Sequence, residues 1–115
     1  MAMPRKHYED DLQRDVMGFI RLQYPHIISF HVPNGGKRGP REAARLKRQG
    51  VLAGVSDILL YWQDSFAAIE LKYGENDMSK PQAYFADKLQ KFGGKFAVCR
   101  SVEEVQTIMK AWGVK

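Results

Sequence analysis

Two carboxylates and an amine, Asp57, Glu70 and Lys72, flank two strand-like runs of apolar residues in the middle of the chain. The runs cover residues 58–62 and 66–72, and the polar break between them is short enough for a hairpin turn. Because side chains alternate across a strand, Glu70 and Lys72 are predicted to share one face. The pattern therefore predicts a hairpin that gathers charged groups at one end.

The register of this hairpin decides whether the two acids meet. If Trp62 pairs with Ser65, the same ladder places Asp57 opposite Glu70, with their Cβ atoms roughly 5 Å apart. A slip of one residue would send Asp57 to the opposite face, which the apolar side chains need for the core. Two like charges at that separation favour a cation between them, so the register predicts a site for a divalent metal.

The same three side chains also have a structural interpretation, because ion-pair networks cluster charges as well. Asp57 and Glu70 would then be strand-end acids that are bridged to Lys72. Two observations favour the functional interpretation. Glu70 interrupts an otherwise apolar strand, where an unpaired charge is costly, and the loop-like Gly-Val-Ser segment before Asp57 leaves room for a substrate.

A helix is predicted over residues 8–24, and Pro25 ends it. Its apolar stripe at helical spacing consists of Leu12, Val16, Phe19 and Ile20. Glu9 falls on this stripe, so it could supply a third carboxylate from the buried side of the helix. The more ordinary interpretation of Glu9 is an acid in the first helical turn, where the positive end of the helix dipole favours it.

Ser79 and Gln82 match a capping box that starts another helix, which ends at the glycine pair 93–94. The residues of this helix that are predicted to face inward are Phe85, Leu89 and Phe92. Gln82 lies on the same stripe and could face inward too, but helix capping is the preferred interpretation from the pattern alone.

The remaining elements predict a single α/β domain that covers residues 1–115. They are a strand over residues 26–32, a basic helix after Pro40, a strand over residues 95–100 and a last helix from Ser101 to Gly113. A strand, a helix and another strand near the end of the chain imply a right-handed crossover. The expected fold is therefore a mixed β-sheet with flanking helices.

The chain carries a formal charge of +5 and has a pI near 9.4, which favours a polyanionic partner such as a nucleic acid. The most basic segment contains Lys37, Arg38, Arg41, Arg45 and Arg48. The last three recur at helical spacing, and a solvated helix face is the usual meaning of such a stripe. Because the preceding glycine loop carries two more cations, contact with a nucleic-acid backbone is about as well supported.

Composition also indicates the compartment. The single cysteine, Cys99, excludes an internal disulfide and fits a reducing environment. No apolar run is long enough to span a bilayer, and the first residues lack the apolar core of a signal peptide. We therefore expect a soluble, cytoplasmic protein without a membrane partner.

Oxygen ligands such as these carboxylates select Mg²⁺ or Mn²⁺ over zinc. The histidines are scattered without zinc spacing, no glycine loop has the spacing of a phosphate-binding motif, and no serine lies in a nucleophile elbow. The chemistry that remains is metal-assisted hydrolysis of a phosphodiester, in which the metal polarises a phosphoryl oxygen and activates a water. Lys72 would hold or deprotonate that water and offset negative charge at phosphorus.

Two short motifs resemble the bipartite signature of the PD-(D/E)xK nuclease superfamily. They are Gly54-Val55-Ser56-Asp57 and Glu70-Leu71-Lys72. Together with Glu9, Gln82 and the helix end at Gly93, they make the chain similar to the virus-type replication-repair nuclease (VRR-NUC) domain from about Tyr8 to Val105. Ser56 stands where the superfamily often has proline, at a position that shapes the turn rather than binding metal.

The resemblance implies a restriction-endonuclease-like nuclease core and a role for each matching residue. The metal ligands would be Asp57, Glu70, the Leu71 carbonyl and Glu9. Lys72 would be the catalytic lysine, and Gln82 the polar residue that supports the site. Mg²⁺ or Mn²⁺ would be the cofactor.

The resemblance also implies a divalent-metal-dependent DNA endonuclease of a bacterial or phage-infected host cell. A homodimer would present two active sites to branched DNA such as a Holliday junction. Two alternatives are a DNA-binding module that does not cleave and a restriction-type endonuclease of the same fold. The complete set of Asp57, Glu70 and Lys72 argues against the first, and the short chain leaves little room for the recognition elements of the second.

Overall fold

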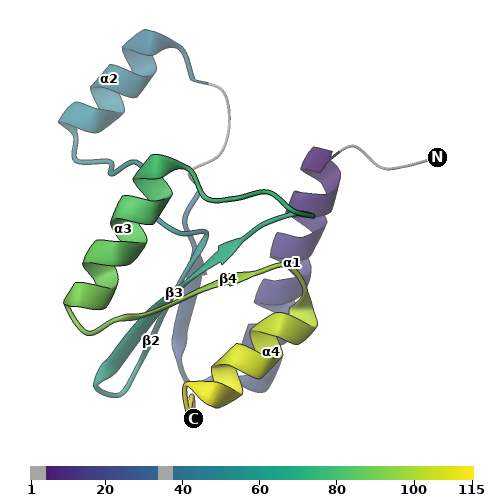
Figure 1. Ribbon diagram of the computed structural model, residues 1–115. Helices are drawn as coiled ribbons and strands as arrows, with labels where there is room; N and C mark the ends of the chain where they lie inside the picture. The colour runs from purple at the N-terminus through teal and green to yellow at the C-terminus, as the bar shows by residue number, and fades with distance from the viewer. Residues whose placement is uncertain (1–4, 34–37) are drawn as a thin grey trace.

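The computed structural model describes residues 5–33 and 38–115, which form a four-stranded sheet with helices on both faces (Figure 1). In chain order the elements are α1 (Arg5–Gln23), β1 (Ile28–His31), α2 (Pro40–Arg48), β2 (Ile58–Trp62), β3 (Ser65–Leu71), α3 (Lys80–Lys91), β4 (Lys95–Cys99) and α4 (Val102–Ala111). This order confirms the predicted mixed α/β domain. No helix in the described part of the chain has the length and apolar character that crossing a membrane requires.

The sheet is mixed, with the strands in the order β1-β2-β3-β4. The pairs β1–β2 and β2–β3 are antiparallel, whereas β3 and β4, which α3 connects, run parallel. In the β2–β3 hairpin Trp62 pairs with Ser65 and Ile58 pairs with Ile69, which is the predicted register. One further step along this ladder brings Asp57 opposite Glu70.

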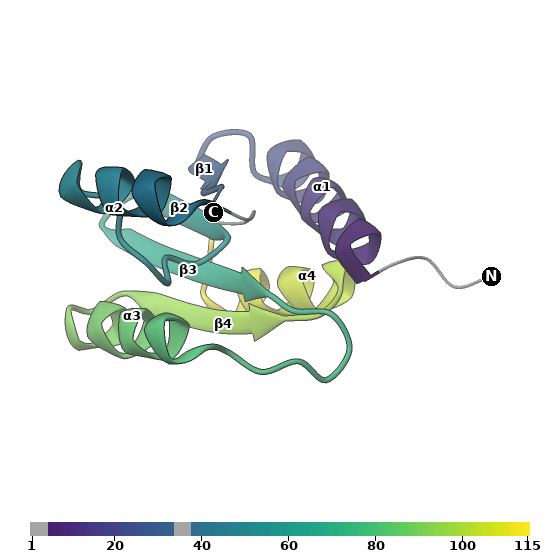
Figure 2. The same cartoon turned by 90° about the horizontal axis from the view of Figure 1, so that it is seen from above.

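The core lies between the sheet and the helices α1 and α4, which cover the same face (Figures 1 and 2). Val16 and Ile20 of α1 are fully buried there against alternate side chains of the hairpin. The buried side chains from the other elements include Ile58, Leu60, Ile69, Val105 and Met109. Alternation along β2 and β3 therefore places apolar side chains in this core and directs Glu70 and Lys72 to the other face.

The other face is covered over β3 and β4 by α3, which turns into β4 through a glycine pair (Figure 2). A Cβ added to Gly94 would lie 2.5 Å from the Phe66 ring and 2.8 Å from Cγ of Leu89. The close packing of the end of α3 on the sheet thus needs a residue without a side chain at this position. That packing fixes where the first turn of α3 lies relative to the end of β3.

Two sequence predictions about helix ends are wrong. The first helix begins at Arg5 rather than at residue 8, so Glu9 lies in the second turn and is not a first-turn acid. Phe92, predicted to face inward, is 70% exposed. Phe92 is the C-cap residue of α3, with φ −91° and ψ 9°, so the helical period that directs its neighbours inward no longer holds there.

α2 lies apart from the sheet and has no buried residue (Figure 1). Pro40 occupies its first turn, as predicted, and Gly39 is its N-cap. At its C-terminus the Gly50 amide donates to the Lys47 carbonyl and the Val51 amide to the Leu46 carbonyl, both at 3.0 Å. These are the two hydrogen bonds of a Schellman motif, which fixes the direction in which the chain leaves the helix.

The contact at Gly94 predicts opposite effects for two glycine-to-alanine substitutions. Gly94→Ala should lower the free energy of unfolding by about 1–3 kcal/mol, because the new methyl group overpacks the Phe66 ring. Gly18→Ala, in the middle of α1 with no atom near its added Cβ, should raise it by about 0.5–1 kcal/mol. Urea denaturation of both variants measures the difference, and equal effects at the two sites would contradict this packing.

Candidate active site

Asp57, just before β2, is held by both neighbouring strands. Its Oδ2 accepts a hydrogen bond of 2.7 Å from the amide of Leu71 on β3. Its carbonyl accepts from the Val32 amide at 2.8 Å and lies 2.8 Å from Nδ1 of His31. A carbonyl can only accept, so Nδ1 of His31 carries the proton in this contact. Both the backbone and the side chain of this residue are therefore fixed at the end of the sheet.

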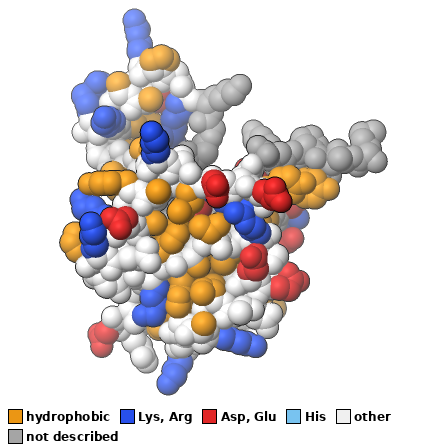
Figure 3. All heavy atoms as spheres, in the orientation of Figure 1, with side chains coloured by type: hydrophobic (Ala, Val, Ile, Leu, Met, Phe, Trp, Pro, Cys, Tyr) orange, Lys and Arg blue, Asp and Glu red, His pale blue; other side chains and the backbone are white. Residues whose placement is uncertain are grey.

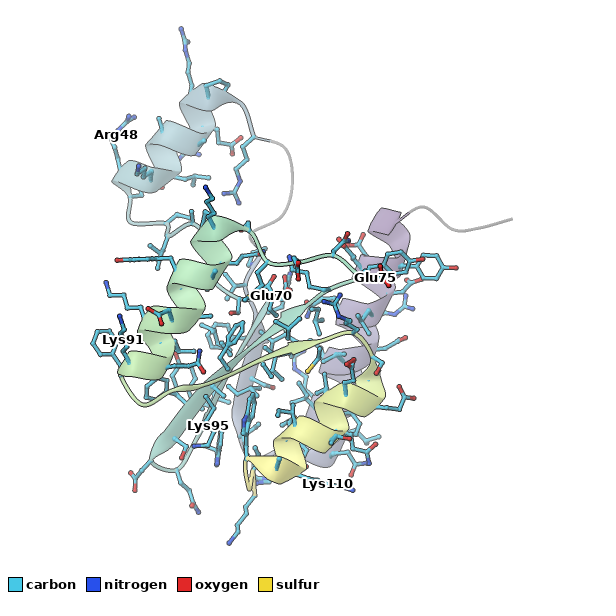
Figure 4. The ribbon with its side chains drawn as sticks, viewed as in Figure 1. Arg48, Glu70, Glu75, Lys91, Lys95 and Lys110 are labelled. Atoms are coloured by element: carbon cyan, nitrogen blue, oxygen red, sulfur yellow. The ribbon has the colours of Figure 1, made fainter. Side chains whose placement is uncertain are left out.

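Glu70 is 2% exposed and lies inside the molecule, between α3 and α1 (Figure 4). Its Oε1 accepts a hydrogen bond of 2.9 Å from Nε2 of Gln82 and lies 3.7 Å from Nζ of Lys72. Its Oε2 is buried and has no hydrogen-bond partner. A native structure rarely leaves such an oxygen without a partner unless the site serves a function.

The surroundings of Glu70 favour its neutral form. The pKa of the Glu70 carboxyl is raised from 4.5 to about 8, mainly by burial and then by the neighbouring Asp57 carboxylate, while the charge on Lys72 opposes the rise. A salt bridge with Lys72 would by itself lower the pKa, so desolvation and like charge outweigh it here. Additional positive charge next to these two acids would therefore favour the ionised form of Glu70.

Gln82 has both of the roles that were considered from the sequence. As the third residue of α3 it completes the capping box: its amide donates to Oγ of Ser79 at 3.3 Å, and its Oε1 accepts from the Ser79 amide at 2.8 Å. The same Oε1 accepts a hydrogen bond of 2.8 Å from Nζ of Lys72, while Nε2 donates to Glu70. One amide thus starts the helix and orients both charged groups.

The start of α3 is packed against the loop that leads to Asp57. Gly54 has φ +86°, a conformation that favours glycine, and an added Cβ would collide with the carbonyl group of Pro81 and approach the Gln82 amide nitrogen. The Gly-Val-Ser segment was expected to leave room for a substrate, but Gly54 is packed against the start of α3 and Ser56 is buried. The segment fixes the two halves of the site, Asp57 and the Gln82 turn, relative to each other.

Glu9 contributes to a hollow of about 160 Å³ at the end of the sheet. The hollow is lined by Glu9, Asp10, Gln13, His31, Asp57 and Leu71. Next to it the rings of Tyr8 and Tyr73 stack with their centroids 4.9 Å apart, which ties the start of α1 to the segment after β3. The structure thus places the predicted helix carboxylate on the same hollow as Asp57 and the predicted carbonyl ligand.

The donors at this end of the sheet fit a hard divalent cation in part. No three His, Cys, Asp or Glu side chains in residues 5–33 and 38–115 are close enough together to hold a metal ion, so Glu9 does not form a three-carboxylate cluster with Asp57 and Glu70. The two hairpin acids nevertheless present what such a cation needs: oxygen donors, a buried oxygen without a hydrogen-bond partner, and a Glu70 pKa that is raised by burial and by like charge.

The predicted DNA-binding residues lie on a different part of the molecule. Arg38 and the stripe Arg41, Arg45 and Arg48 are exposed, and cationic side chains gather over the α2 region in Figure 3. The guanidinium of Arg38 donates to the Pro33 carbonyl at 3.4 Å, and Arg45 lies 3.9 Å from the Glu42 carboxylate. Lys37 lies outside the described residues.

The sequence reasoning missed three polar residues around the hairpin end. His31, interpreted as incidental, lines the hollow and contacts the Asp57 carbonyl. Nε2 of Gln13 and Oγ of Ser56 are, with Oε2 of Glu70, the buried side-chain atoms in the described part of the chain that have no hydrogen-bond partner. Gln13 follows Glu9 by one helical turn, so the sequence could have predicted that the two share a helix face. The position of His31 depends on strand pairing, which no local pattern encodes.

Comparison with known proteins identifies a family that this chain matches. A profile of the VRR-NUC domain matches residues 9–103, a range that includes both hairpin motifs. A solved structure described as "VRR_NUC domain protein" superposes with a TM-score of 0.74 at 24% sequence identity, over 96% of this chain and 89% of that chain. This likeness supports the fold. No curated protein matches the sequence significantly.

The raised pKa of Glu70 predicts how stability depends on pH. Between about pH 4.5 and 8 the folded state holds a proton on Glu70 that the unfolded state has lost, so the free energy of unfolding should fall as pH rises through this range. The fall is at most about 1.4 kcal/mol per pH unit. Glu70→Gln should flatten the profile, because the amide does not ionise. Denaturation in EDTA at several pH values measures both profiles.

The exposed Glu75 provides the matched control, since Glu75→Gln makes the same chemical change away from the buried pair (Figure 4). Its pH profile should follow that of the unsubstituted protein. Equal slopes for the unsubstituted protein and Glu70→Gln would show that Glu70 does not retain its proton on folding.

Proposed function

This chain belongs to the VRR-NUC domain family, and we propose that it is a divalent-metal-dependent DNA endonuclease selective for branched DNA such as four-way junctions. Membership of the family implies a nuclease-type function. The observation that best supports the metal-dependent proposal is Glu70, buried beside Asp57 with one oxygen lacking a hydrogen-bond partner. An enzyme that cuts phosphodiesters gains from such a site, because a divalent cation there would neutralise both acids and contact the substrate.

Mg²⁺ or Mn²⁺ would be held by Asp57, Glu70 and the Leu71 carbonyl, with Glu9 facing it from the wall of the hollow. When bound, the cation would supply Lewis acidity toward a phosphoryl oxygen and acidify a water. The protein itself prepares the donors. The Leu71 amide orients the Asp57 carboxylate, and Nε2 of Gln82 donates a hydrogen bond to Oε1 of Glu70. Oε2 of Glu70 has no hydrogen-bond partner and would be the oxygen that binds the metal.

Lys72 is the residue best placed to act on the reacting groups. Its side chain is 14% exposed, and its amine is fixed by Oε1 of Gln82 and by the nearby Glu70 carboxyl. A fixed amine at this point would position the attacking water, assist its deprotonation and offset the charge that develops at phosphorus. The role of Gln82 is positioning, since it acts through Glu70 and Lys72.

The cationic surface of α2 would bind the DNA backbone at a place separate from the active site. Arg41, Arg45 and Arg48 are exposed on a helix that contributes no buried residue to the core, so their side chains are accessible to a DNA backbone. A homodimer would bring two such surfaces and two active sites to the arms of one junction. Selectivity for branched DNA in this proposal rests on that pairing of sites.

The decisive experiment incubates the purified protein with a four-way junction, a flap and a linear duplex, each with Mg²⁺, Mn²⁺ or EDTA. The proposal expects cleavage that requires metal and is fastest on the branched substrates. Binding without cleavage of any substrate would favour a non-cleaving DNA-binding module. Equal cutting of duplex and junction would favour an endonuclease of the same fold without junction selectivity.

Lys72→Ala should reduce the cleavage rate by at least about a hundredfold, because it removes the amine that acts on the water and the phosphate. DNA binding measured in EDTA should change little, since Lys72 is mostly buried. Lys91→Ala is the matched control, because Lys91 is an exposed lysine on the outer surface of α3 (Figure 4), and this variant should cleave at the unsubstituted rate. Cleavage by Lys72→Ala at the unsubstituted rate would remove Lys72 from the mechanism.

Replacing Arg41, Arg45 and Arg48 together by alanine should weaken DNA binding and flatten its dependence on salt. Each lost phosphate contact reduces the slope of log K against log [salt] by about 0.9. A variant with Arg21, Lys91 and Lys110 replaced by alanine changes the net charge equally on other elements and should retain the slope. Titrations from low to moderate salt make the comparison, and an unchanged slope in the first variant would leave the α2 stripe as a solvated surface.

A further inference from the structure

We propose that the hollow beneath α2 binds an unpaired nucleotide of the DNA substrate, with its base on an apolar floor and its phosphate on Arg38 and Lys47. The inference rests on the proposed function and identifies what the site recognises in branched DNA. The hollow measures about 470 Å³, and its lining combines Arg38 and Lys47 with the apolar side chains of Ala43, Leu46, Val51 and Leu52. This volume lies within the range of small-molecule binding sites.

The apolar lining is not part of the folded core. α2 contributes no buried residue, while Val51 is 42% and Leu52 is 57% exposed. Single exposed apolar residues are common on proteins. Here two consecutive ones face a hollow whose other members include two cations, and they extend the most basic region of the chain. Folding gains little from this arrangement, so the surface is available for a ligand.

The chemistry of the lining matches one class of ligand within DNA. A nucleotide combines a flat, largely apolar base face with a phosphate, and the hollow offers aliphatic surface next to a guanidinium and an amine. In a paired duplex the base faces are stacked, so the phosphates and the base edges in the grooves are accessible but the base faces are not. An unpaired nucleotide exposes both parts, so this site would distinguish a branch point, gap or bulge from uninterrupted duplex.

A short segment after α2 connects the hollow to the active site. The Schellman motif after α2 sets the direction of Val51. The segment that follows ends at Gly54, which lines the hollow and packs against Pro81 and Gln82. Because Gln82 contacts both Glu70 and Lys72, a nucleotide held beneath α2 would be connected through this short segment to the groups that act on the reacting phosphate.

The test measures binding in EDTA, so that no cleavage occurs. Fluorescence anisotropy compares a fully paired duplex with the same duplex carrying one unpaired 2-aminopurine nucleotide. The unsubstituted protein should prefer the bulged duplex and change the 2-aminopurine emission. Replacing Val51 and Leu52 together by serine should weaken binding of the bulged duplex about tenfold, change binding of the paired duplex less than twofold, and abolish the emission change.

Leu22→Ser is the matched control, since Leu22 is 77% exposed on α1 and outside the hollow; it should retain the preference. Thermal unfolding checks that each variant is folded, and Leu52→Ser alone replaces the double variant if that one does not fold. Equal binding of the two duplexes by the unsubstituted protein, or a preference that survives the serine substitutions, would overturn the inference. A preference in EDTA together with no cleavage in Mg²⁺ would overturn the nuclease proposal instead and support this site.

Discussion

A carboxyl group buried beside a second carboxylate is the constraint on which the rest of this structure depends. Burial and like charge both disfavour ionised Glu70, and the protein compensates only in part, through Gln82 and Lys72. The hairpin register, the turn before Asp57 and the first turn of α3 all serve to hold this unfavourable pair together. A fold selected for stability alone would replace Glu70 with an apolar residue, so its presence indicates that function determines this end of the sheet.

In the proposed function, the molecule separates two tasks, catalysis and DNA binding, between parts that differ in packing. The sheet shares its buried core with α1 and α4, carries α3 on its other face, and holds the two acids at its end (Figures 1 and 2). α2 carries cations without entering the core. A rigid scaffold suits chemistry, which needs groups fixed to within fractions of an ångström. A peripheral cationic helix suits a polymer substrate, because backbone contacts tolerate variation in sequence and shape. The residues 49–54 connect the two parts.

The sequence was sufficient for the parts that local patterns control. The hairpin register followed from the need to keep apolar side chains on one face, and the capping box at Ser79 followed from residue types three positions apart. Errors arose where local periodicity ends, as at Phe92 after the last turn of α3. Contacts between segments that are distant in the chain could not be predicted from the sequence. The contact of His31 with Asp57 requires β1 to pair with β2, and no local sequence pattern specifies which strands will be neighbours in the sheet.

The Gln82 amide both caps α3 and orients charged side chains. It therefore couples the fraying of a helix end to the geometry of the site, two properties that are usually independent. Helix ends fray readily, because their terminal amides have few partners. In this protein the group that closes the first turn of α3 also holds the charged groups of the site. Fraying of that turn would therefore remove the Gln82 hydrogen bonds of Lys72 and Glu70 together. Opening of a single helical turn is a local equilibrium, which can vary while the global stability of the domain stays constant.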